Sequence, residues 1–97
     1  MSEEDQMIFD RCMTVGHAEL EAGGAGNIAN SVIAFQQAIR VAYAPFAAAH
    51  AHVMLGKALR LQSKTRKAHI AFATAKELAA DNASLMKFIE QEEKGGV

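Results

Sequence analysis

Apolar residues recur every three or four positions along most of the chain, a spacing that places them on one face of a helix. Helix-breaking residues interrupt this pattern at the glycines of 23–26, before Pro45, near Ser63 and at Asp81–Asn82. The pattern therefore predicts five helices. Their expected bounds are about 3–22, Asn27 or Asn30 to about Ala42, 45–61, Ser63 to about Ala80, and about 83–94.

The expected helix ends follow from residues that cap or break helices. Ser2 and Ser63 can accept a hydrogen bond from a free backbone N–H of the first turn, so we expect both as N-caps. Proline is tolerated in a first turn, which fits Pro45 as the start of the third helix. We expect Gly95–Gly96 to end the last helix, and we expect residues 23–26 to form a turn that cannot hold helix.

Each of the later helices carries one apolar stripe, and these stripes define the expected core. Alanine is the commonest residue and the best helix former, and the chain has a single proline. Together these features predict an all-α fold. The stripe residues are Ile28, Ser31, Phe35, Ala38 and Ala42 in the second helix, Ala48, Ala51, Leu55 and Leu59 in the third, Ala68, Phe72, Ala75 and Leu78 or Ala79 in the fourth, and Leu85, Phe88 and Ile89 in the fifth.

The length and charge of the chain narrow its class. Its 97 residues are enough for one domain. Ten lysines and arginines against eleven aspartates and glutamates give a formal charge of −1. This balance lacks the positive excess that drives nonspecific binding to nucleic acid, and the basic residues near Ser63 carry no interleaved aromatic side chains for base stacking. A nucleic-acid-binding role is therefore disfavoured.

The first residues and the cysteine content bear on location. Residues 1–5 are acidic where a secretory signal would be basic and then apolar. No uncharged run is both long and apolar enough to span a bilayer. The single Cys12 cannot form an internal disulfide, which suits a reducing compartment. We therefore expect a cytoplasmic protein that does not bind membranes.

Two parts of the chain resemble each other at a nearly fixed offset, which indicates an internal repeat. Residues 15–18 correspond to 55–58, which lie 40 positions on, and residues 33–38 correspond to 70–75, which lie 37 positions on. The two offsets differ by three, which we attribute to the glycines of 23–26 lengthening the first turn. The chain is therefore expected to be a duplicated helical hairpin.

The duplicated pattern resembles the tetratricopeptide repeat, which reads W-x2-L-G-x2-Y, then A-x3-F, then an alanine and a proline over about 34 residues. The second hairpin keeps this spacing, with His52 in place of the tryptophan and Ala80 in place of the proline. The first hairpin is more divergent, with Cys12 and Glu19 at two positions where large residues are usual. The signature positions are Val15, Gly16, Phe35 and Ala38 in the first hairpin, and Leu55, Gly56, Leu59, Ala68, Phe72 and Ala75 in the second.

The resemblance implies an α-hairpin solenoid of two helix pairs, over about 3–42 and about 45–80, with a capping helix over about 83–94. Neighbouring hairpins in such a fold must stack to bury their apolar faces. Two hairpins fall short of the three or so that stability usually needs. The fifth helix is therefore expected to cap the fold, or alternatively to dock on a partner. Because of the same shortage, the chain could alternatively form a homodimer or a permanent complex with another chain.

The first helix of each hairpin in a tetratricopeptide array lines a concave groove that holds a partner segment. The resemblance therefore implies a protein–protein interaction module that acts as an adaptor, an assembly factor or a chaperone-like scaffold. The implied groove is mixed apolar and mildly cationic, which suits a segment with acidic and apolar residues. By repeat position its residues are Met13, His17, Leu20, His50, Val53, Lys57, Arg60, Lys87 and Gln91.

No set of residues with catalytic, cofactor-binding or metal-binding spacing converges in the sequence. His50 and His52 are two apart, which places them on different sides of a helix. Cys12 and His17 are five apart, a poor spacing for an activated thiol. We therefore expect no enzyme, no cofactor and no metal site. The alternative to groove binding is a structural subunit of a homo-oligomer or a permanent hetero-complex.

Overall fold

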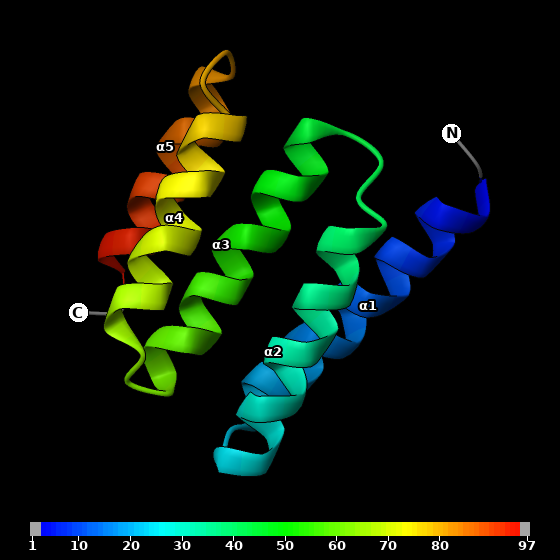
Figure 1. The fold of residues 1–97 in the computed structure, drawn as a ribbon, viewed down its shortest axis with the longest axis vertical. Helices are drawn as coiled ribbons and strands as arrows, with labels where there is room; N and C mark the ends of the chain where they lie inside the picture. Colours follow the sequence, from blue (N-terminus) through cyan, green and yellow to red (C-terminus); the bar gives the residue numbers. More distant parts are fainter. Residues whose placement is uncertain (1–2, 96–97) are drawn as a thin grey trace.

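Five helices joined by short turns make up the computed structural model, which describes residues 3–95 (Figure 1). No strand occurs in this range, so the all-α prediction is confirmed. The predicted bounds of the first, third and fifth helices agree with those observed. Ser2, the predicted N-cap of the first helix, and Gly96, predicted to help end the last helix, lie outside the described residues. The helices are α1 (Glu3–Ala22), α2 (Ala25–Arg40), α3 (Pro45–Leu61), α4 (Thr65–Leu78) and α5 (Ala83–Lys94).

The helices form two hairpins, α1–α2 and α3–α4, that pack together through α2 and α3. In Figure 1, α1 lies behind α2 and α5 lies behind α4, with α3 between the two groups. The fifth helix packs on both α3 and α4, and α1 also contacts α3. Because α3 contacts each of the other four helices, it forms the centre of the domain.

Two phenylalanine rings occupy corresponding places in the two hairpins. Phe35 of α2 is fully buried against Gly16 of α1, where an added Cβ would lie 2.5 Å from ring carbon Cε1. Phe72 of α4 is buried against Gly56 of α3, where an added Cβ would lie 2.9 Å from ring carbon Cε2. In a close-packed interior, neither ring can move aside cheaply. Each hairpin therefore depends on a glycine at the same repeat position in its first helix.

Most of the predicted stripe residues are buried, whereas Ala42, Ala48, Leu85 and Phe88 are half-buried. Ala42 lies beyond the end of α2, and of the two alternatives at the end of α4, Ala79 is buried and Leu78 is 37% exposed. Among the signature positions, Val15 is 46% exposed whereas its counterpart Leu55 is 9% exposed. The difference arises because α1 is packed only against α2 and α3, whereas α3 is enclosed by four helices.

The glycine turn of the first hairpin is shorter than predicted. Helix α2 begins at Ala25, so only Gly23 and Gly24 separate it from α1, with φ of 72° and 86° that suit glycine. The prediction that residues 23–26 lengthen this turn is wrong. Phe35 is the eleventh residue of α2, whereas Phe72 is the eighth of α4. The extra three residues therefore form nearly one additional turn of helix at the start of α2.

Ser63 ends α3 and does not cap α4, contrary to the prediction. Its φ is 63°, its N–H donates to the carbonyl oxygen of Arg60 at 2.9 Å, and the N–H of Lys64 donates to that of Leu59 at 2.9 Å. This pair of bonds is the Schellman motif, which satisfies the last carbonyls of a helix. Helix α4 consequently begins at Thr65 and has no side-chain cap.

Two other helix ends differ slightly from prediction. Helix α2 ends at Arg40, not at about Ala42, and α4 ends at Leu78, not at about Ala80. The side-chain N-cap that the structure does show belongs to Asn82, whose Oδ1 accepts a hydrogen bond from the Leu85 N–H at 3.0 Å. Asn82, which was expected only to break the chain's helical pattern, therefore also starts α5.

Candidate protein-binding face

Helices α1, α3 and α5 share one side of the molecule, which we call the inner face and define by His17, His50 and Phe88. The three rings contact in series, with centroid distances of 6.0 Å for His17–His50 and 5.6 Å for His50–Phe88. All three side chains are half-buried. The inner face is therefore a continuous ring surface that spans three helices, with its side chains held in place by each other.

Burial favours the uncharged form of both histidines on the inner face. Burial is the main reason that the pKa of His17 lies below its usual value, and nearby Lys57 lowers it further, while Glu21 acts in the opposite direction. Burial also lowers the pKa of His50, with His17 and Lys57 adding to the effect and Glu92 opposing it. A buried imidazole loses its proton more readily because the low-dielectric surroundings disfavour the charged form.

A cleft of about 360 Å³ opens between α1 and α3 beside these histidines. We call it the aromatic cleft, because Phe9, Tyr43 and Phe46 form part of its wall. The centroids are 5.4 Å apart for Phe9–Tyr43 and 5.7 Å apart for Tyr43–Phe46, with ring planes nearly perpendicular in both pairs. Such edge-to-face pairs hold the rings in a preferred geometry. The other lining residues are Asp10, Met13, Thr14, His17, Ala47 and His50.

Sequence reasoning placed none of these three aromatic rings at the site. A signal for one of them was present, since Phe46 lies four residues before His50 on the same helix and therefore on the same face. Phe46 is 53% exposed in the structure, an unusual degree of exposure for a phenylalanine. Tyr43 carries no such signal, because it lies between helices and only the path of the chain brings it to the cleft.

Lys57 and Arg60 were predicted to line the groove, and the structure directs both toward the last turn of α5. The Lys57 Nζ lies 2.6 Å from Glu92 Oε1. Arg60 donates hydrogen bonds to the carbonyl oxygens of Glu93 at 2.7 Å and of Glu92 at 3.0 Å, and its guanidinium lies 5.2 Å from the centre of the Phe72 ring. Carbonyls in the last turn of a helix lack intrahelical partners and carry partial negative charge. Both cations therefore hold α5 against α3.

The remaining predicted groove residues lie in three different environments. Met13 and Val53 are buried, at 7% and 0% exposure, so they support the inner face from beneath. Lys87 and Gln91 are exposed on α5. Leu20 is half-buried and lines a second cavity near the helix turns. Of the nine predicted residues, the structure thus brings His17 and His50 together in direct ring contact.

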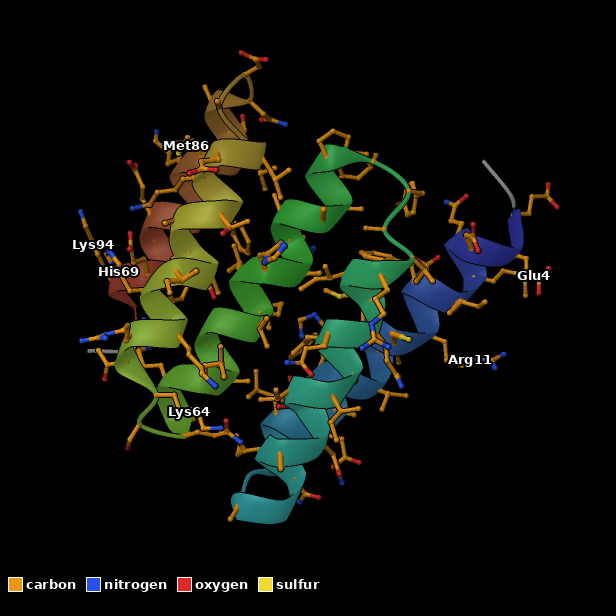
Figure 2. The ribbon with its side chains drawn as sticks, in the orientation of Figure 1. Glu4, Arg11, Lys64, His69, Met86 and Lys94 are labelled. Carbon is orange, nitrogen blue, oxygen red and sulfur yellow. The ribbon has the colours of Figure 1, made fainter. Side chains whose placement is uncertain are left out.

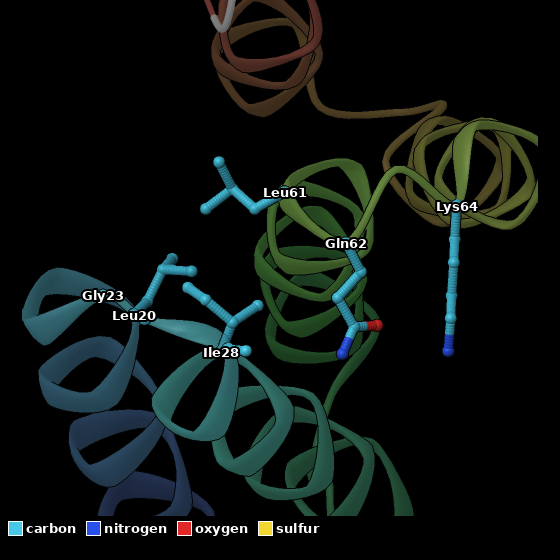
Figure 3. A pocket seen from close by; sticks show the side chains of 8 residues that line it. Leu20, Gly23, Ile28, Leu61, Gln62 and Lys64 are labelled. Atoms are coloured by element: carbon cyan, nitrogen blue, oxygen red, sulfur yellow. The ribbon is translucent and has the colours of Figure 1, made fainter.

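The second cavity, which we call the turn pocket, has a volume of about 620 Å³ and lies between the α1–α2 turn and the α3–α4 turn (Figure 3). The side chains of Leu20, Ile28 and Leu61 converge on it, while Lys64 extends away. Gln62 also lines it, and the buried Oε1 of Gln62 has no hydrogen-bond partner among the described residues. The turn pocket is thus largely apolar, with one acceptor left unsatisfied.

The side of α2 and α4 that carries Ile33 and Ile70, which we call the outer face, is also partly apolar. These residues lie at equivalent repeat positions and are 52% and 57% exposed. Charged side chains such as Glu4, Arg11 and Lys94 extend outward from the periphery of the molecule (Figure 2).

Within residues 3–95, the structure shows no group of three or more histidine, cysteine, aspartate or glutamate side chains placed to hold a metal ion. The Cys12 Sγ lies 4.0 Å from Gln37 Oε1. None of the helices in this range is long and apolar enough to cross a membrane.

The geometry of the inner face is the basis on which a function can be proposed. No family model, curated protein or solved structure matches this chain.

Proposed function

We propose that this chain is a tetratricopeptide-like interaction module that binds a segment of another protein along the inner face. The observation that carries the proposal is the ring series of His17, His50 and Phe88, which continues into the aromatic cleft. A pre-formed surface rich in apolar and aromatic groups, with a few polar groups, suits the recognition of a peptide. The role would be that of an adaptor, an assembly factor or a chaperone-like scaffold.

The repeated glycine–phenylalanine contact supports the tetratricopeptide-like part of the proposal. Gly16 and Phe35 in one hairpin meet in the same way as Gly56 and Phe72 in the other, and all four stand at signature positions. The packing of α5 supports its proposed role as the cap, because Ile89 is fully buried where α5 meets α3 and α4. With this helix in place, the second hairpin does not expose its free apolar side.

The contacts of Lys57 and Arg60 change the kind of segment that we propose. An acidic segment was expected because these cations were placed in the groove. Since Lys57 pairs with Glu92 and Arg60 binds α5 carbonyl groups, their charge is largely satisfied within the fold. The partner segment is therefore chiefly apolar at the inner face, and charge reversal at Lys57 or Arg60 would disturb α5 as well as any binding.

Site-specific photo-crosslinking in native extract tests the proposal. A photoreactive phenylalanine analogue is placed at Phe46 or Phe88 on the inner face, and at Ile33 or Ile70 on the outer face as matched controls. We expect one and the same partner to crosslink through both inner-face positions and through neither outer-face position. Crosslinks confined to Ile33 and Ile70, in variants whose circular dichroism matches the wild type, would refute it.

A structural subunit is the second candidate, and the exposed Ile33 and Ile70 favour it. Exposed apolar side chains that recur on one face often mark a permanent interface. In that case the chain would self-associate or require another subunit for stability. Light scattering that shows a well-folded monomer at micromolar concentration would count heavily against this candidate.

A further inference from the structure

The near-zero net charge of the chain conceals a strong internal asymmetry. Helix α1 carries six acidic residues and one basic residue, Arg11. The segment from α3 to α4, by contrast, carries six basic residues and one acidic residue, Glu77. Helix α1 as a whole therefore carries an excess of negative charge, which attracts cationic groups.

The aromatic cleft contains one formal charge at neutral pH, the carboxylate of Asp10. No other lining residue is acidic or basic apart from His17 and His50, and burial lowers the pKa of both histidines so that they are uncharged. Asp10 is exposed and makes no ion pair with any of the residues 3–95. A carboxylate beside three aromatic rings, with no cation to balance it, is therefore open to a ligand.

We propose that the aromatic cleft binds a lysine or arginine side chain of the partner segment, with its charged end at Asp10 and the rings of Tyr43 and Phe46. This inference rests on the proposed function, because it names the residue that a segment on the inner face presents. A cation gains electrostatic energy near aromatic rings, and the carboxylate adds a charge-assisted hydrogen bond. The methylene stem of either side chain packs well against apolar walls.

The position of the cleft favours a side chain on a polypeptide over a free small cation. His17 and His50 belong both to the cleft lining and to the ring series of the inner face. A segment that lies across this ring series therefore passes the mouth of the cleft. The volume of about 360 Å³ is at the lower end of the range for ligand sites, which is ample for one long side chain.

The test is a nuclear magnetic resonance titration of the isotope-labelled full chain with three capped peptides. The peptides consist of alanine and leucine and differ only in one central residue, which is arginine, norleucine or glutamate. We expect the arginine peptide to shift the amide signals around Asp10, Tyr43 and His50 at the lowest concentration. Asp10→Asn should weaken its binding about tenfold, which corresponds to the loss of one charge-assisted contact.

Glu4→Gln provides the matched control, because Glu4 lies on the same helix, extends outward from the molecule (Figure 2), and loses the same charge. The control should bind the arginine peptide as the wild type does. An equal loss in both variants would mean that only the general field of α1 attracts the peptide, which would overturn the assignment to the cleft.

The other outcomes separate this inference from the proposed function. Equal shifts of the inner face by all three peptides would overturn the inference and leave the proposed function intact. Shifts confined to the outer face would contradict both. Self-association of the wild type that Asp10→Asn abolishes would place a basic residue of a second copy in the cleft, and would overturn the assignment to a separate partner.

Discussion

Gly16 and Gly56 set the distance between the two helices of each hairpin, because a buried phenylalanine ring lies directly on each of them. An added Cβ would lie 2.5 Å from the Phe35 ring at Gly16 and 2.9 Å from the Phe72 ring at Gly56. Both distances are shorter than a van der Waals contact, and the first is the more severe. The absence of a side chain at these two positions therefore determines the geometry of the hairpins.

Gly16→Ala should destabilise the fold by up to about 2 kcal/mol, because overpacking a rigid core costs about 1–3 kcal/mol and a gain of about 1 kcal/mol in helix propensity offsets part of that cost. Gly56→Ala should cost less, because its clash is milder. Gly26→Ala serves as the control, since a Cβ there meets no atom within 4 Å, and it should leave stability unchanged or raise it slightly. Urea unfolding measures all three, and equal stabilities for the alanine variants at positions 16 and 26 would contradict the packing described.

The paired histidines predict that stability falls as the pH drops below neutral. The pKa values of His17 and His50 lie below 6.5 in the folded state, so the unfolded chain binds more protons as pH falls through the usual histidine range. The contribution of these two neutral histidines to the free energy of unfolding is therefore fully present above this range and is lost as the pH falls through it.

The double variant His17→Gln with His50→Gln should show a smaller drop in melting temperature between about pH 7.5 and pH 5.5 than the wild type. The melting temperature of the double variant should still depend on pH to some extent, since burial also lowers the pKa of His52. The exposed His69 on α4 supplies the control, and His69→Gln should keep the full drop. A double variant as sensitive to pH as the wild type would show that the inner-face histidines are not the cause.

At the scale of elements, α5 is held by one buried anchor and by polar contacts at its end. Ile89 is fully buried. Arg60 binds two carbonyl groups of the last turn, and Lys57 and Lys76 pair with Glu92 and Glu93. Both ion pairs are about one-third exposed, so each contributes little by itself. The guanidinium of Arg60 is therefore the main polar contact that fixes the C-terminal end of α5.

Arg60→Gln should loosen α5 without unfolding the hairpins. We expect the free energy of local opening of α5 to fall by about 1–2 kcal/mol, because charge-assisted hydrogen bonds to two carbonyl groups are lost at a half-buried site. Hydrogen exchange of the α5 amides reports this change, with the α1 amides as an internal reference. Lys64→Gln removes a nearby exposed charge and should have no such effect, and equal protection of α5 in both variants would contradict the role of Arg60.

Local signals are sufficient to predict most helix bounds, because caps, breakers and apolar spacing act over a few residues. Pro45 at the start of α3 and the apolar stripe of Phe35 and Ala38 are examples. Ser63 escaped prediction because its side chain suits an N-cap, whereas the backbone at that point is already used to close the end of α3. The choice between the two roles depends on the geometry of the turn, which composition does not reveal.

The site was harder to predict than the helices, because its contacts are distant in sequence. The repeat placed His17 and His50 on corresponding faces, and the structure shows that their rings meet. The repeat could not show that Glu92 and the α5 carbonyls would engage Lys57 and Arg60, since that requires the docking position of α5. Tyr43 reaches the cleft from a loop, for which helical spacing provides no guide.

The whole molecule presents two faces with different chemistry. The inner face is made of half-buried rings and ends in a cleft that contains Asp10, whereas the outer face exposes Ile33 and Ile70. The slab measures 35 × 27 × 18 Å, so both faces lie close to the same core. A small domain of this size has little stability to spare, and binding of a partner on either face would stabilise it.

The proposed use of the inner face is tested most directly by mapping amide chemical shifts of the labelled chain. The ligand is the crosslinked partner, or the segment of that partner that was crosslinked. We predict the largest shifts around His17, His50 and Phe88, and little change around Ile33 and Ile70. Shifts centred on Ile33 and Ile70, with the signals of His17, His50 and Phe88 unmoved, would contradict the account.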